Sequence, residues 1–232
     1  MLGESLAEVQ ALVADLVGSK LKRLEERVEA LEDALRAVGG GGEKLETDQM
    51  QASLHVLDPV VSNGIEALME WTCSTRATVV YDSTVDPFTA DGLFTKIRGK
   101  QNVAVIATTS EGDVFGGFYS VAVTEQDTNV NDPTVFAFSL ESHWRCMTPQ
   151  MFVVNPWLSE KAGVCFCKND RFGFVKFGVY GVGCFWLGGV GSQSFSSSCS
   201  HVFEDLMDDT LTGKSGTTNP YNCQHLLAFQ FN

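Results

Sequence analysis

The sequence lacks the features that assign a chain to several common classes. No stretch of it reaches the roughly 18–20 apolar residues that a membrane-spanning helix needs. Residues 1–20 carry three acids and one base, so we expect no secretory signal peptide. Proline is scarce, at 6 residues, whereas glycine is plentiful, at 22. This balance favours strands joined by tight turns over long linkers.

The sequence also has few positively charged residues. Lys and Arg number 16 against 29 Asp and Glu, which gives a formal net charge of −13. A chain this acidic repels phosphate backbones and anionic lipid surfaces, so nucleic acid and membranes are excluded as default partners. A basic protein surface remains a suitable partner. Hydrophobic residues make up 44%, which is typical of a globular chain and excludes disorder over the full length.

The cysteine content points to a reducing compartment. Seven cysteines, an odd number, do not fit a paired framework of disulfides, and no Asn-x-Ser/Thr acceptor for glycosylation occurs. We therefore expect a cytoplasmic protein with free thiols.

Four consecutive glycines at 39–42 divide the chain. We interpret residues 1–38 as a coiled-coil helix, 39–52 as a flexible linker and 53–232 as one folded domain. Apolar residues follow heptad steps of 3 and 4 at Leu21, Leu24, Val28, Leu31, Leu35 and Val38. Lys20 and Arg27 would face Glu25 and Glu32 of a parallel partner, which predicts self-association. The sequence does not distinguish a dimer from a trimer. Two alternatives also stay open: a lone helix that folds back onto the domain, and a helix and tetraglycine appended as an oligomerisation tag.

The domain is predicted to be mainly β (α+β), as a two-sheet antiparallel sandwich or barrel flanked by short helices. One helix is expected over Pro59–Trp71, and a second from an Asp86 N-cap and Pro87 to Arg98. Residues 188–222 should be long loops. Short apolar runs separated by turn residues predict strands over Arg76–Tyr81, Asn102–Thr108, Asp113–Val123, Thr134–Leu140, Met151–Asn155, Gly163–Cys167, Phe172–Val179, Gly183–Leu187 and Leu226–Phe231.

The sequence contains only weak matches to catalytic, phosphate-binding and metal-binding motifs. The closest stretch to a nucleophile elbow, Gly189–Ser194, has neither required glycine in place, and no phosphate-binding loop occurs. Cys165, Cys167, Cys199 and His201 are soft metal ligands without the Cys-x₂₋₄-Cys spacing of structural zinc, so buried thiols are the preferred interpretation. The acidic run at Glu204, Asp205, Asp208 and Asp209 is interpreted as a surface for a basic partner. We expect no catalytic residue, metal or cofactor.

Segments spread along the domain match the pattern of a known family. They are Leu68–Thr72, Ala77–Thr84, Phe94–Lys100, Val103–Thr108, Glu111–Phe118, Phe136–Leu140, Gly183–Leu187 and Leu226–Phe231. Together they resemble the TLDc domain family. The domain departs from the family pattern at Pro87-Phe88 and at the closing Gln-Phe-Asn. Structural roles are expected for the matched residues Trp71, Tyr81, Asp82, Ser83, Gly112, Phe115, Gly116, Gly117 and Trp186.

The resemblance implies a β-sandwich without catalytic residues. It also implies a link to oxidative-stress resistance and to regulation of the vacuolar proton-ATPase. The leading hypothesis is therefore a non-enzymatic interaction or adaptor protein that self-associates through its coiled coil. Two alternatives are a metal- or thiol-dependent redox protein using Cys165, Cys167, Cys199 and His201, and a hydrolase of unrecognised type.

Overall fold

The computed structural model describes residues 59–143, 146, 148–169, 173–189, 194, 196–216 and 219–232. The predicted coiled coil at 1–38 and linker at 39–52 lie outside the described residues. The chain divides into two units, Met1–Ser62 and Asn63–Asn232, and the second unit contains the described strands.

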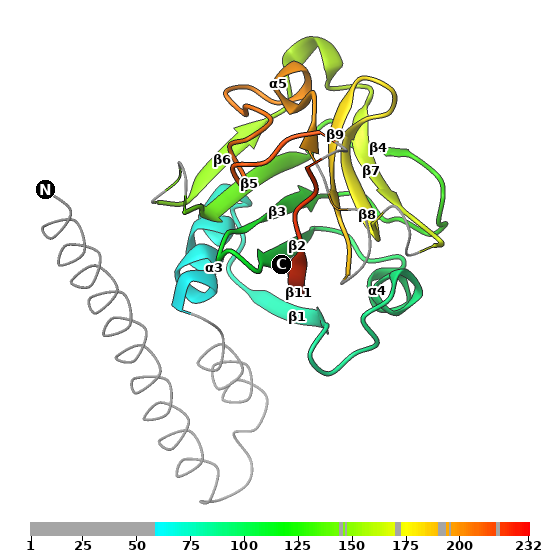
Figure 1. Cartoon of the computed structure of the whole chain (residues 1–232). Coiled ribbons are helices and arrows are strands. Elements are labelled where there is room, and N and C mark those ends of the chain that lie inside the picture. Colours follow the sequence, from blue (N-terminus) through cyan, green and yellow to red (C-terminus); the bar gives the residue numbers. More distant parts are fainter. Residues whose placement is uncertain are drawn as a thin grey trace, which may run out of the picture. The chain divides into compact units, whose positions relative to one another are not determined.

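Two antiparallel sheets form the core of the second unit (Figure 1). The six-stranded sheet has the order β1-β11-β2-β3-β5-β6, with β1 Ala77–Asp82, β11 Cys223–Phe231, β2 Val103–Thr109, β3 Val114–Tyr119, β5 Phe136–Glu141 and β6 Gln150–Val153. The five-stranded sheet has the order β10-β9-β8-β7-β4, with β10 Ser196–Ser197, β9 Gly183–Leu187, β8 Val175–Val179, β7 Ala162–Phe166 and β4 Val130–Asn131. The predicted mainly-β fold with two antiparallel sheets is confirmed.

The described helices are short: α3 Pro59–Trp71, α4 Ala90–Ile97, the 3₁₀ turn η1 Pro156–Leu158 and α5 Cys199–Val202. None of them combines the length and apolar character needed to cross a membrane. The predicted start of α4 was wrong. Thr89 is the N-cap, and its hydroxyl oxygen accepts a hydrogen bond from the Gly92 N–H at 3.0 Å. The Asp86 carboxylate instead pairs with Lys96 at 2.6 Å and accepts from the Asp82 N–H at 3.1 Å.

Sequence reasoning also missed short elements within 188–222. The segment contains β10 and α5, each too short to produce a period of apolar residues. The last strand, β11, begins at Cys223 rather than Leu226, with an irregular register between Cys223 and His225. The continuous apolar run Leu226–Phe229 starts only after this irregularity, which explains the late predicted boundary.

The space between the sheets is filled with aromatic side chains. Phe115 from the six-stranded sheet contacts Phe185 from the other sheet and Tyr221, with ring centroids 6.2 and 5.3 Å apart. A second apolar layer lies on the far side of the six-stranded sheet, where Phe118 stacks on Phe136 at 4.9 Å and Trp71 of α3 contacts Phe136 at 6.3 Å. The central strands β2 and β3 are therefore buried on both faces.

Two adjacent glycines allow this close packing. A Cβ at Gly117 would lie 2.5 Å from the Phe177 ring of the opposite sheet, and one at Gly116 would lie 1.9 Å from the Val105 carbonyl oxygen. Real Cβ atoms do not approach other atoms this closely, so a larger residue at either position would force the backbone apart.

Candidate functional site

A polar cluster closes the turn between β2 and β3. Gly112 in this turn has φ +93°, a conformation that favours glycine. The Thr109 hydroxyl oxygen accepts from the N–H groups of Glu111 at 3.3 Å and Asp113 at 3.1 Å, and the hydroxyl donates to the Asp113 carboxylate at 3.0 Å. One threonine side chain therefore holds both acidic residues of the turn.

The Asp113 carboxylate is fully buried and orients a histidine. Its Oδ1 accepts from the His143 backbone N–H at 3.1 Å and lies 2.5 Å from His143 Nδ1. His143 follows β5, and its side chain is 43% exposed. A carboxylate bonded to Nδ1 determines the ring orientation and leaves Nε2 as the free nitrogen.

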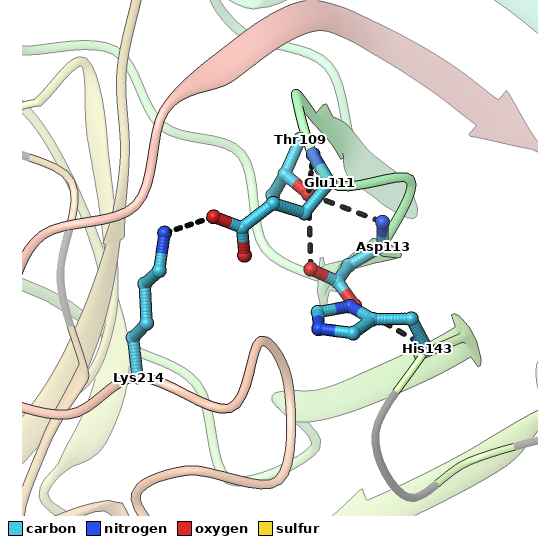
Figure 2. Close-up of polar contacts among 5 residues, drawn as sticks. All are labelled: Thr109, Glu111, Asp113, His143 and Lys214. Carbon is cyan, nitrogen blue, oxygen red and sulfur yellow. Dashed lines mark hydrogen bonds and ion pairs between the residues drawn. The ribbon is translucent and has the colours of Figure 1, made fainter. Parts of the chain in front are cut away.

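The Glu111 side chain points away from Asp113 and His143 and forms an ion pair with a lysine. Its carboxylate pairs with Lys214, from the loop before β11, as Figure 2 shows. Both side chains are partly exposed, so this ion pair is screened by solvent and stabilises the fold only slightly.

The cluster has the donor set of a cation site. Ligand atoms of Glu111, Asp113 and His143 lie within 4.8 Å of one another, and two carboxylates with one imidazole suit a divalent metal. Both carboxylates already have protein partners. Asp113 is bonded to Thr109 and His143, and Glu111 forms an ion pair with Lys214. A metal would have to replace these partners. We therefore interpret the cluster first as a clamp on the hairpin.

Sequence reasoning missed this cluster. Glu111 and Asp113 are close in sequence, but His143 lies 30 residues beyond Asp113 and Lys214 lies 103 residues beyond Glu111. The local signal was Thr109 two residues before Glu111 and four before Asp113, which is typical of a side chain that caps a turn.

A second histidine–carboxylate pair joins β1 and β11. Asp82 Oδ1 lies 2.8 Å from His225 Nε2 and also accepts from the Thr84 N–H and hydroxyl at 2.8 and 2.7 Å. Burial raises the pKa of Asp82, but the hydrogen bonds from His225 and Thr84 outweigh it and hold the pKa below the ordinary value of 3.8.

The other family-motif residues lie at packing or bonding positions. The Tyr81 hydroxyl donates to the Pro87 carbonyl at 3.0 Å, and the Ser83 hydroxyl oxygen accepts from the Leu226 N–H at 3.0 Å. The Trp186 carbonyl accepts from the buried Tyr221 hydroxyl at 2.6 Å. The first contact joins β1 to the turn before α4, the second joins the residue after β1 to β11, and the third joins β9 to the loop before β11.

The structure does not bring the four soft ligands of the redox alternative together. Cys199 is fully buried in the core between the sheets, whereas Cys165 lies on the opposite, outer face of β7. Within the described part of the chain, the potential metal ligands that come together are Glu111, Asp113 and His143. A shared metal site of Cys165, Cys167, Cys199 and His201 therefore has no support.

The predicted acidic surface contains residues of two kinds. Glu204 and Asp205 are exposed, whereas the Asp208 carboxylate accepts from the N–H groups of Ser198 and Cys199 at 3.0 and 2.5 Å. Asp209 is partly buried. Asp208 therefore anchors the start of α5, and Glu204 and Asp205 present their charge to solvent.

Exposed apolar side chains accompany these acids at the edge strand β6. The Glu204 N–H donates to the Val153 carbonyl at 2.8 Å, which holds the acidic loop against β6. Val153 is 42% exposed, Trp157 75% and Met207 55%. We refer to Val153, Trp157, Glu204, Asp205 and Met207 as the β6-edge surface.

Comparison with known families gives a match over most of the chain. The family model of the TLDc domain matches residues 50–231. A search of curated proteins finds no match.

Replacing Asp113 tests the clamp. Asp113→Ala leaves the Thr109 hydroxyl and the His143 N–H without their buried acceptor, so we expect unfolding free energy to fall by about 1–3 kcal/mol. Urea denaturation measures this loss. The matched control, Glu111→Gln, removes only an exposed ion pair and should change stability by less than about 1 kcal/mol. Equal effects of the two substitutions would contradict a clamp centred on Asp113.

Replacing His225 tests the β1–β11 pair through its pH dependence. Because the folded pKa of Asp82 lies below 3.8, the pair stabilises the fold fully above that value. The stabilisation is lost as pH falls through the lower folded pKa. We expect the stability difference between the wild type and His225→Gln to shrink as pH falls below 3.8. Thermal melts at stepped pH measure it, and a difference that stays constant would contradict the assignment.

Proposed function

Because the chain belongs to the TLDc domain family, we propose that it is a non-enzymatic, cytoplasmic protein-interaction module. The family association suggests roles in oxidative-stress resistance and in regulating the vacuolar proton-ATPase. On this proposal the sandwich presents a binding surface, and the residues 1–38 bring several sandwiches together.

The β6-edge surface is the observation that carries the proposal. Trp157 is 75% exposed and Met207 55%, although large apolar side chains on a folded domain are ordinarily buried. Tryptophan is enriched among the residues that dominate binding energy at protein interfaces. Glu204, bonded through its backbone N–H to Val153, and the adjacent Asp205 add negative charge to this surface.

This combination defines the chemistry of the partner. An apolar pocket rimmed by Lys or Arg would bury Trp157 and complement the two carboxylates. The overall charge of −13 adds long-range attraction to a basic partner and raises its association rate. A basic surface on a subunit of the vacuolar proton-ATPase is the partner that this proposal names.

Self-association would strengthen a weak single contact. Two or more sandwiches linked by a coiled coil at Leu21, Leu24, Val28, Leu31, Leu35 and Val38 would bind a multi-subunit target with higher apparent affinity, without any new contact. The tetraglycine at 39–42 would supply the reach between them.

The binding half of the proposal is tested with purified vacuolar proton-ATPase and the full chain. Trp157→Ala with Met207→Ser should weaken capture at least about tenfold, because an interface tryptophan contributes about 1.4 kcal/mol or more. Surface immobilisation of the ATPase measures the affinity.

The control for that experiment is Val85→Ala, which alters another exposed apolar residue, 81% accessible, in the turn after β1. It should bind like the wild type. If the wild type does not bind the ATPase, or if the Val85 and Trp157 variants weaken binding equally, the β6-edge surface is not the docking site.

The assembly half is tested by light scattering after size-exclusion chromatography. Leu24→Lys with Leu31→Lys places charges in the apolar seam of the predicted coiled coil and should convert oligomers to monomers at micromolar concentration. Exchanging the charges of Glu25 and Lys20 instead should preserve the oligomer. A wild-type monomer would overturn this half alone.

A further inference from the structure

Two thiols share the outer face of the five-stranded sheet. Along β7, Ala162, Val164 and Phe166 point into the core between the sheets, so Cys165 and Cys167 lie on the opposite face. Cys165 is partly exposed, and Cys167, one residue past the strand, is 9% exposed. The accessible thiol and its protected neighbour are therefore two residues apart on one surface.

A buried lysine faces the accessible thiol from the next strand. Lys176 on β8 is directly opposite Cys165 in the antiparallel register and is only 3% exposed. Its Nζ lies 4.6 Å from the ring centroid of Tyr180 and 5.5 Å from that of Trp186, which is its partner on β9. Both rings can stabilise the ammonium by cation–π attraction, so a positive charge is held in place beside the thiols.

The surroundings give the two sulfurs different acidities. The hydrogen bond from Cys167 and, secondarily, the charge of Lys176 lower the pKa of Cys165 to about 7, against the opposing effects of burial and of Asp127. The same hydrogen bond and burial raise the pKa of Cys167. Near neutral pH, a substantial share of Cys165 is thiolate while Cys167 keeps its proton.

We propose that Cys165 and Cys167 form a redox-modification site that reacts with hydroperoxides, with Cys165 as the attacking sulfur and Cys167 as the resolving one. Lys176 is a positioning residue that stabilises the Cys165 thiolate. This proposal is independent of the docking surface, and it uses neither Cys199 nor His201.

Two balanced steps describe the chemistry. The Cys165 thiolate attacks one peroxide oxygen; an S–O bond forms, the O–O bond breaks, and hydroxide or an alkoxide leaves. Sulfur loses two electrons and the peroxide gains them. The Cys167 thiol then gives up its proton and attacks the sulfenic sulfur; an S–S bond forms, the S–O bond breaks, and water leaves.

The strand geometry predicts that this disulfide is readily reduced. Residues two apart on a strand have Cα atoms about 6.6 Å apart, near the upper limit of about 6.8 Å for a disulfide. Closing the bond pulls on the strand end, and strained disulfides are the more easily reduced ones.

Other cysteines of the same chain supply internal controls. Cys199 and Cys223 are fully buried, and burial raises the pKa of Cys223 to about 11, so neither should react at neutral pH. Cys73 is exposed and has no lysine placed opposite it in a strand register. It reports the reactivity of an accessible thiol.

The test oxidises the reduced full chain with an equal concentration of hydrogen peroxide at pH 7, followed by trypsin and mass spectrometry. Cleavage after Lys161 and Lys168 gives a peptide, residues 162–168, that contains both thiols and no other cysteine. We expect this peptide to lose the mass of two hydrogen atoms before Cys73 is oxidised, and dithiothreitol to restore it. In Cys167→Ser, dimedone should trap a sulfenic acid at Cys165.

Lys176→Met keeps most of the unbranched side chain and removes its charge. We expect alkylation of Cys165 by iodoacetamide at pH 7 to slow by about threefold, because the thiolate share falls while its intrinsic nucleophilicity rises. The Cys73 rate should be unchanged. The wild-type pH profile is an independent readout: Cys165 should reach its half-maximal rate near pH 7, below the ordinary thiol pKa of about 8.5.

Three results would overturn the proposal. One is oxidation of peptide 162–168 no faster than that of Cys73. Another is a Cys165 pH profile whose midpoint lies at or above the ordinary thiol pKa of about 8.5. The third is an oxidised peptide in which each sulfur carries oxygen but no disulfide forms.

Discussion

The central hairpin of β2 and β3 is the part of the fold on which the rest depends. Both strands are buried on both faces, so one set of their side chains packs against the opposite sheet and the other set against the layer that contains Phe118, Phe136 and α3. Gly117 lets the Phe177 ring approach the hairpin backbone, and the Thr109–Asp113 clamp closes the turn. A hairpin enclosed in this way leaves the edges and ends of the sandwich for recognition.

Patterns within a segment were predictable from the sequence, whereas contacts between distant segments were not. Strand β2, for example, has an apolar run of five residues, Val103–Ala107, and short apolar runs of this kind identified the two-sheet fold. The two-residue strands β4 and β10 are too short to show a period. The N-cap at Thr89 was missed because Asp86-Pro87 is an equally good local start, and only the pairing of Asp86 with Lys96 rules it out.

The polar cluster at the β2–β3 turn shows the same limit on prediction from sequence. Glu111 and Asp113 are two residues apart in the sequence, but His143 and Lys214 reach their turn only because β5 pairs with β3 and the loop before β11 passes nearby. Composition likewise gives the number of acidic residues but does not distinguish carboxylates that bond within the fold from those that face solvent. Some carboxylates accept hydrogen bonds within the fold, namely those of Asp82, Asp86, Asp113, Asp132 and Asp208. Others, such as Glu204 and Asp205, face solvent.

The position of β11 bears on how the domain is made in the cell. This strand lies between β1 and β2, although it is synthesised more than 110 residues after β2. While the ribosome is still adding residues before Cys223, β1 has no strand partner and β2 has one unpaired edge. A nascent chain in this state presents open strand edges to neighbouring polypeptides. Completion of the six-stranded sheet therefore waits for β11, whereas a sandwich assembled in chain order can pair each strand as it emerges.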